Sequence, residues 1–116
     1  MVKPISTRVH GVLDYMTVGT LIAGPRMMRW DERVTRLTTY AGVGVLGYSL
    51  MTRYELGLIK ALPMPAHLML DAGGGMLLAA APFTLVKSEG TAVVAALIGV
   101  GLFEITVAAL TRTKLS

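Results

Sequence analysis

Two pairs of histidine and aspartate are the residues of this chain most capable of binding a ligand or transferring a proton. His10 lies four residues before Asp14, and His67 lies four residues before Asp71. Residues at this spacing share one face of a helix, so each pair would set an imidazole beside a carboxylate. Such a pair can form a hydrogen bond, bind a transition metal or exchange a proton. Which of these it does depends on the helices that position it.

Most of the remaining sequence is apolar. Of the 116 residues 53% are hydrophobic and 16% are charged, whereas a soluble domain carries about 25% charged residues. The charges gather between four apolar stretches, at about residues 9–24, 37–52, 65–81 and 91–111. With their flanks, such stretches approach the roughly 20 residues that span a hydrocarbon core of about 30 Å. The sequence therefore predicts one membrane domain, residues 1–116, folded in the lipid bilayer as an all-α bundle of four transmembrane helices.

Proline and capping residues predict where these helices begin and end. Pro25 would close the first helix, because proline lacks an amide proton and disfavours helix in the residue before it. Residues 26–36 would form a polar loop with Trp30 as an interfacial anchor. Pro65 suits the first turn of the third helix, and Thr91 suits the N-cap of the fourth. The turn before the fourth helix comprises Lys87, Ser88, Glu89 and Gly90.

A shift of 57 residues superposes the first half of the sequence on the second. It places His10 on His67, Asp14 on Asp71, Pro25 on Pro82 and, without a gap, Gly42-Val43-Gly44 on Gly99-Val100-Gly101. We interpret the match as a tandem duplication of a two-helix hairpin, with repeat 1 at about 5–60 and repeat 2 at about 61–116. Two crossings per repeat make the repeats parallel, with a pseudo-twofold axis along the membrane normal. Many secondary transporters are built from inverted repeats, so parallel repeats are weaker support for a transporter function.

The basic residues that give the chain its positive net charge lie beside the predicted membrane spans. The net charge is +4, but the Lys and Arg residues adjoin apolar segments without interleaved aromatics, so no nucleic-acid partner is predicted. Of the 11 Lys and Arg residues, six lie on the side of the termini and five on the other. This small excess favours cytoplasmic termini in a multi-pass protein of the cell (inner) membrane. The chain has no cysteine, which excludes disulfides and thiol catalysis.

The segments HGVLDY and HLMLDA, each followed eleven residues after its Asp by a proline, resemble the SPW-repeat family of small prokaryotic membrane proteins. The resemblance covers nearly the whole chain and implies two helices per repeat. The naming Ser-Pro-Trp triplet would fall at Gly24-Pro25-Arg26 and Ala81-Pro82-Phe83, where only the proline matches. The family implies a fold, and it implies no established activity or site residues.

The ionisable residues within the apolar stretches predict one buried polar layer. At about 1.5 Å per residue, both aspartates lie roughly 9 Å from the start of their helices, and the returning helices bring other polar groups to the same depth. An ionisable group in hydrocarbon costs about 2.5 to 3.5 kcal/mol, so these groups should face inward. The predicted members of the cluster are His10, Asp14, Tyr48, His67, Asp71 and Glu104.

Four interpretations of this layer remain open. The one we favour is structural: each histidine donates a hydrogen bond to its own aspartate, and Arg8, Arg53 or Arg112 pairs with them at the surface. In a second, His10, Asp14, His67, Asp71 and Glu104 supply ligands for Zn, Mn or Fe. In a third, His10 and His67 hold a haem. In a fourth, Asp14, Asp71 and Glu104 form a proton or cation path.

The sequence predicts a function only in outline. We expect a small integral membrane protein that acts as a structural or interaction subunit, either as a homo-oligomer or within a larger membrane complex. The alternatives are proton or cation conduction and a metal- or haem-binding bundle. We expect neither enzymatic activity nor a cofactor, because no nucleophile-elbow pattern and no specific metal motif is present.

Overall fold

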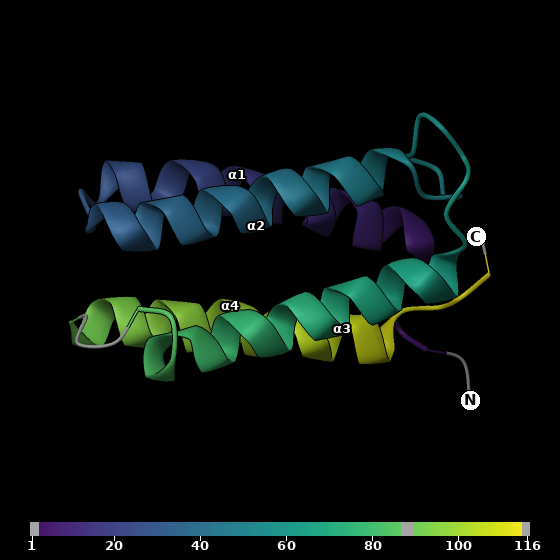
Figure 1. Ribbon diagram of the computed structural model, residues 1–116. Helices are drawn as coiled ribbons and strands as arrows, with labels where there is room; N and C mark the ends of the chain where they lie inside the picture. Colours follow the sequence, from purple (N-terminus) through teal and green to yellow (C-terminus); the bar gives the residue numbers. More distant parts are fainter. Residues whose placement is uncertain (1–2, 87–89, 115–116) are drawn as a thin grey trace.

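Two helical hairpins lie side by side in the structure (Figure 1). The structure is a computed structural model and describes residues 3–86 and 90–114. Helices α1 (Thr7–Met27) and α2 (Glu32–Leu50) form the first hairpin. Helices α3 (Met64–Ala80) and α4 (Thr91–Leu110) form the second, with the short 3₁₀ helix η1 (Ala81–Phe83) directly after α3. The prediction of an all-α fold with four helices is confirmed.

Local chemistry explains where the helices begin. The Ser6 hydroxyl accepts a hydrogen bond from the Val9 amide at 3.2 Å and caps α1. Pro63 precedes α3 and Pro65 lies in its first turn, as predicted, where a missing amide proton costs nothing. The predicted N-cap of α4 is wrong by one residue, because Gly90 is the N-cap and Thr91 is the first helical residue. The predicted turn residues Lys87, Ser88 and Glu89 lie outside the described residues.

Helix α1 does not end at Pro25, as predicted, but runs two residues further. Its last carbonyls are capped by a Schellman motif: the Trp30 amide donates to the Pro25 carbonyl at 2.9 Å, and the Arg29 amide donates to the Arg26 carbonyl at 3.3 Å. Arg29 adopts the left-handed conformation that this motif requires, with φ of 55°. The backbone cap, not the proline, therefore ends the helix.

The predicted polar loop at residues 26–36 is mostly helical. Helix α2 begins at Glu32, and its N-cap Asp31 accepts a hydrogen bond from the Arg33 amide at 2.9 Å. Glu32 and Arg36 then form an exposed ion pair one turn apart, at 3.1 Å. The apolar stretch, which begins at residue 37, covers only the uncharged part of this helix. The charged residues from Glu32 to Arg36 are helical as well. Trp30 packs, half-buried, against the apolar core.

Short parallel bridges close the end of the molecule at which α1 and α3 begin. Ile5, before α1, pairs with Thr111, after α4, and Leu62, before α3, pairs with Thr52, after α2. The Ile5 amide donates to the Leu110 carbonyl at 3.2 Å, and the Leu62 amide donates to the Met51 carbonyl at 2.7 Å. The two hairpins are thus tied in the same way, and the two ends of the chain lie at this end of the bundle (Figure 1).

The burial pattern of the first hairpin matches that of the second, but the residue offset differs between the two helix pairs. Along α1 and α3, residues 57 apart are buried together, as at Leu21 and Leu78. Along α2 and α4, the buried residues are 59 apart: Val34 with Val93, Gly42 with Gly101, Ser49 with Ala108 and Thr52 with Thr111. The predicted gapless match of Gly42 to Gly99 is therefore wrong, since Gly99 is exposed. Two additional residues between α3 and α4 account for the difference.

The bundle interior is apolar at the end opposite the bridges. A core cluster there consists of Leu21, Val34, Leu78, Ala81, Val86, Val93 and Leu97. Among the described residues, one helix is long and apolar enough to cross a membrane, namely α4, with a mean hydropathy of 2.3.

Candidate functional site

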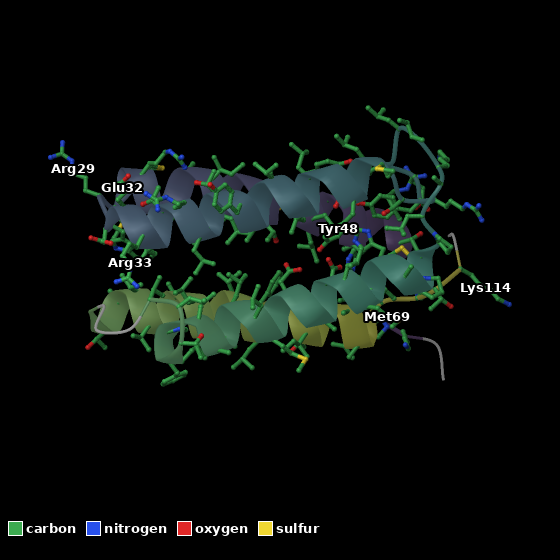
Figure 2. The ribbon with its side chains drawn as sticks, viewed as in Figure 1. Arg29, Glu32, Arg33, Tyr48, Met69 and Lys114 are labelled. Carbon is green, nitrogen blue, oxygen red and sulfur yellow. The ribbon has the colours of Figure 1, made fainter. Side chains whose placement is uncertain are left out.

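Four ionisable side chains meet between the two hairpins. His10 and Asp14 come from α1, and His67 and Asp71 come from α3. Their exposed fractions are 1%, 3%, 0% and 1%, so all four are buried. One ligand atom from each lies within 4.8 Å of those of the other three. Tyr48, labelled in Figure 2, reaches from α2 into the same region. We call His10, Asp14, His67 and Asp71 the His–Asp centre.

The shortest contacts in the His–Asp centre join the two hairpins. His10 Nε2 lies 2.6 Å from Asp71 Oδ2, and His67 Nε2 lies 3.0 Å from Asp14 Oδ2. The contacts within each pair are 3.2 Å, both for His10 with Asp14 and for His67 with Asp71. The expectation that each histidine bonds mainly to its own aspartate is therefore wrong. The helices pack so that each imidazole reaches across to the other hairpin.

The expected surface arginines do not complete the His–Asp centre. Arg53 Nε donates to the Lys60 carbonyl at 3.2 Å, and Arg112 Nε donates to the Lys3 carbonyl at 2.8 Å. These arginines instead fasten the two bridged segments. Among the described residues, the ion pairs of the His–Asp centre are formed within the centre itself.

Two threonine hydroxyls fix the orientation and protonation of the imidazole rings. Thr52 Oγ1 donates to the Tyr48 carbonyl at 2.6 Å and lies 2.7 Å from His67 Nδ1. Thr111 Oγ1 donates to the Val107 carbonyl at 2.5 Å and lies 2.8 Å from His10 Nδ1. A hydroxyl has one proton, and a carbonyl can only accept, so each Nδ1 must carry the proton that it donates to its threonine. Both Nε2 atoms are thereby left facing the carboxylates.

Two tyrosines hold the carboxylates from the other side. Tyr54 donates its hydroxyl proton to Asp14 Oδ2 at 2.7 Å, and Tyr48 donates to Asp71 Oδ1. Tyr54 lies in the α2–α3 connection and is fully buried. Burial, together with the charge of Asp14, raises the pKa of Tyr54 well above its usual range, so its hydroxyl remains a donor at neutral pH. Each Asp therefore has a tyrosine donor that fixes its rotamer.

His67 Nε2 has no hydrogen-bond partner although it is fully buried. It approaches both carboxylates, at 3.0 and 3.2 Å, but with a geometry that satisfies neither bond. The ring is wedged in place by its neighbours, because Tyr48 packs edge-on against it with ring centroids 4.9 Å apart. A buried nitrogen held only by ion-pair contacts without hydrogen-bond geometry is incompletely satisfied.

Glu104 lies next to the His–Asp centre but is not one of its four members. It is buried on α4, with an exposed fraction of 7%. Together with Tyr48 and Asp71 it lines a cavity of about 260 Å³ between α2 and α3. The remaining walls of this cavity are apolar, and Gly44, Gly74 and Gly75 contribute no side chain to fill it. The predicted cluster of six thus consists of the four-residue centre, Tyr48 as a donor and Glu104 in the adjoining cavity.

Sequence reasoning missed Thr52, Thr111 and Tyr54. The register of 59 between α2 and α4 pairs the two threonines, but this register appears only once the burial pattern is known. Tyr54 lies in a connection without helical periodicity, so no pattern placed it near Asp14. Each half therefore contributes a His, an Asp and a Thr to the site, whereas the sequence match predicted only the His and the Asp.

The arrangement limits the chemistry that the site can support. A haem between the two rings would need a flat space that the Asp14 and Asp71 carboxylates occupy. Two imidazole nitrogens and two carboxylates can either pair as ions or surround one metal ion. Among protein-family models, curated proteins and solved structures, none matches this chain.

Proposed function

We propose that this chain is a membrane-embedded four-helix protein that acts as a structural or interaction subunit. One observation supports this most strongly, namely that the polarity of the bundle is reversed relative to a soluble protein. Within residues 9–24, 37–50, 65–80 and 92–110 there is no Lys or Arg, and every Asp, Glu and His is buried. Large apolar side chains instead point outward, among them Met16, Val43, Met69, Met76, Leu102 and Phe103.

This reversal also explains why three of the helices look less hydrophobic than α4. The polar residues that lower the hydropathy of α1 and α3, such as His10 and Asp71, face the interior and would not meet lipid. In α2 the charges lie in the exposed first turn, at the level of a membrane surface. Figure 2 locates Arg29, Glu32 and Arg33 at one end of the bundle and Lys114 at the other. We infer four spans, each about 26 to 32 Å long at about 1.5 Å per residue for helices of 17 to 21 residues.

We further infer that the two hairpins are the halves of a tandem duplication with parallel repeats. The paired burial along α1 and α3, the common register of α2 and α4, and the twin bridges support this inference. The resemblance to the SPW-repeat family implies the same arrangement and remains a prediction. A pseudo-twofold axis would then run along the membrane normal and through the His–Asp centre.

An interaction role fits the distribution of the glycines. Gly19, Gly24, Gly44, Gly47, Gly73, Gly74 and Gly99 have no heavy atom within 4 Å of an added Cβ. Such glycines leave backbone open on the outer surface, where small residues allow helices in a membrane to approach closely. A homo-oligomer or a larger membrane complex would cover these positions.

Topology mapping in native membranes tests the proposal directly. Because the chain has no cysteine, single cysteines can be introduced at Lys3, Arg29, Leu58 and Lys114 and labelled with a membrane-impermeant maleimide. We expect Lys3→Cys, Leu58→Cys and Lys114→Cys to react from one side and Arg29→Cys to react only from the other. Met76→Cys, on the outer surface of α3 and within the proposed span, is the matched control and should stay unlabelled in intact membranes.

Labelling of all five positions from one side, or release of the protein from membranes by alkaline carbonate, would contradict the four-span proposal.

The interaction role has a separate test. Copurification from gently solubilised native membranes would identify the subunit partner. Recovery of a strictly monomeric chain under these conditions would argue against the interaction role.

A further inference from the structure

We propose that the His–Asp centre binds one divalent transition-metal ion of the class Mn²⁺, Fe²⁺ or Zn²⁺, through Nε2 of His10 and His67 and one oxygen of each of Asp14 and Asp71. The site lies inside the bundle and is shared between the two hairpins. The inference concerns the interior only and does not depend on the membrane proposal.

The donor set suits this class of ion. Imidazole nitrogen and carboxylate oxygen are ordinary ligands of these metals, and two carboxylates balance the charge of a divalent ion. In helical bundles, metal sites are built from inward side chains on facing helices, which is how α1 and α3 present these residues.

The geometry is close to that of a tetrahedral site. With metal–ligand bonds of about 2.0 to 2.1 Å, the ligand atoms of a tetrahedron lie about 3.3 Å apart. Asp71 Oδ2 lies 2.6 Å from His10 Nε2 and 3.2 Å from His67 Nε2, and Asp14 approaches His67 with Oδ2 at 3.0 Å and His10 with Oδ1 at 3.2 Å. One ligand atom from each of the four residues lies within 4.8 Å of those of the other three. A small outward movement of the side chains therefore opens enough space for the ion, without rearrangement of the helices.

The surrounding hydrogen bonds are those that a metal site requires. A metal-binding histidine usually donates its other ring N–H to a neighbouring group, which fixes the tautomer and the ring orientation. His10 and His67 both do so, to Thr111 and Thr52, and the two hydroxyls are fixed in turn by backbone carbonyls. Hydrogen bonds to tyrosines hold both carboxylates as well. All four side chains are thus oriented before any ion arrives.

The poorly satisfied His67 Nε2 is a further indication of a ligand at the centre. This atom is fully buried and lies 3.0 Å from an Asp14 oxygen and 3.2 Å from an Asp71 oxygen, yet neither contact has the geometry of a hydrogen bond. A purely structural ion-pair lock would be expected to satisfy each of its buried nitrogens. A metal ion at the centre would bind this nitrogen and its symmetry mate, His10 Nε2, in the same way.

The exchange of protons for metal is balanced in charge. Without the ion, each Nε2 must carry a proton to face the carboxylates, and two imidazolium and two carboxylate groups sum to zero. With the ion, two neutral imidazoles, two carboxylates and one divalent cation also sum to zero. Binding therefore releases two protons and leaves no uncompensated charge in the buried site.

Metal loading of the full-length protein tests the proposal. The detergent-purified chain would be stripped with a chelator, dialysed and titrated with Zn²⁺ or with Co²⁺ as a spectroscopic probe. We expect one ion per chain by elemental analysis, visible Co²⁺ absorption bands of a four-coordinate site, and release of about two protons per ion in weakly buffered solution.

Variants distinguish this site from non-specific binding. His67→Asn retains an amide N–H near Nδ1 for Thr52 but removes Nε2, and it should abolish stoichiometric binding. Tyr48→Phe should retain one ion per chain with an affinity about 10- to 100-fold weaker, because only a supporting hydrogen bond is lost. Glu104→Gln removes a nearby buried carboxylate outside the ligand set and should bind like the wild type.

The proposal is overturned if the folded wild-type chain, checked by its circular dichroism, binds neither Zn²⁺ nor Co²⁺ at one ion per chain. It is also overturned if His67→Asn binds as tightly as wild type, or if Glu104→Gln abolishes binding equally. None of these results would affect the labelling pattern that tests the membrane proposal, so the two can fail separately.

Discussion

Thr52 and Thr111 each connect a helix end to an imidazole ring. Their hydroxyls donate to the carbonyl one turn earlier and accept from a histidine Nδ1, so a single buried oxygen links α2 to α3, or α4 to α1. Both threonines are fully buried. The histidine orientation therefore depends on two side chains that carry no charge.

We expect Thr52→Val to destabilise the protein by about 1 to 3 kcal/mol, because the isosteric valine leaves the buried His67 Nδ1–H without an acceptor. Unfolding by denaturant in detergent micelles, followed by circular dichroism, measures the change. Thr52→Ser is the matched control; it keeps both hydrogen bonds and loses one methyl group, at a cost of about 0.8 kcal/mol. A valine variant as stable as the serine variant would show that the hydroxyl does not hold the ring.

The histidines and aspartates could be predicted from the sequence because an ionisable residue in an apolar stretch must face inward. Their partners could not. His10 and Asp14 are one turn apart, and this spacing favoured a contact within the pair, while the shorter contact to Asp71 depends on how two hairpins pack. A threonine after a helix end has the same sequence signature whether its hydroxyl meets water or a buried ring.

Helices α3 and α4 come into backbone contact at Gly75 and Gly101. A Cβ added at Gly101 would meet the Gly75 carbonyl oxygen and lie 2.8 Å from the Ala79 amide nitrogen. A Cβ added at Gly99, on the same helix, would meet nothing within 4 Å. The glycine at 101 is thus required by packing, and the one at 99 is not.

We expect Gly101→Ala to cost about 1 to 3 kcal/mol in unfolding free energy, since backbone atoms must shift to accommodate the methyl group. Gly99→Ala should be neutral or stabilising by up to about 1 kcal/mol, because alanine favours helix over glycine. Thermal or denaturant unfolding of the two variants in the same detergent compares them. Equal destabilisation would contradict the register of 59 residues that pairs Gly101 with Gly42.

The existence and approximate bounds of the four helices followed from the apolar stretches, but their ends did not. Hydropathy detects the part of a helix that lacks charge, so it missed the charged first turn of α2 from Glu32 onward. Proline rules were misleading at Pro25, because a left-handed Arg29 supplied a better cap two residues later. The predicted gapless match was wrong because two additional residues lie between α3 and α4. A loop can contain such residues without changing which helix faces are buried.

The bundle as a whole is polar inside at one end and apolar inside at the other. The His–Asp centre lies toward the end at which α1 and α3 begin, and Leu21, Leu78 and Leu97 fill the opposite end. An ion that reached the His–Asp centre would meet no buried ionisable side chain in this apolar part, among the residues that the structure describes. The architecture therefore supports a static role better than the alternative of proton or cation conduction.

We accordingly expect no flux above background when the wild-type protein is reconstituted in vesicles with a pH or potassium gradient. Asp71→Asn and Glu104→Gln should give the same background rate, because neither carboxylate lies on a continuous path. A wild-type rate that exceeds empty vesicles and falls in either variant would establish conduction and remove the static role.

The twin bridges have a consequence for the order of the chain. Ile5 meets Thr111 as Leu62 meets Thr52, so the junction between the last helix and the first is built like the junction in the middle of the chain. The fold is in this sense nearly cyclic. A circular permutant opened near the exposed Leu58 and Ile59, with its former ends joined, would preserve every helix pairing. The bridges at the two junctions are thus alike, and the connection through residues 51–63 differs in carrying Tyr54, which holds Asp14.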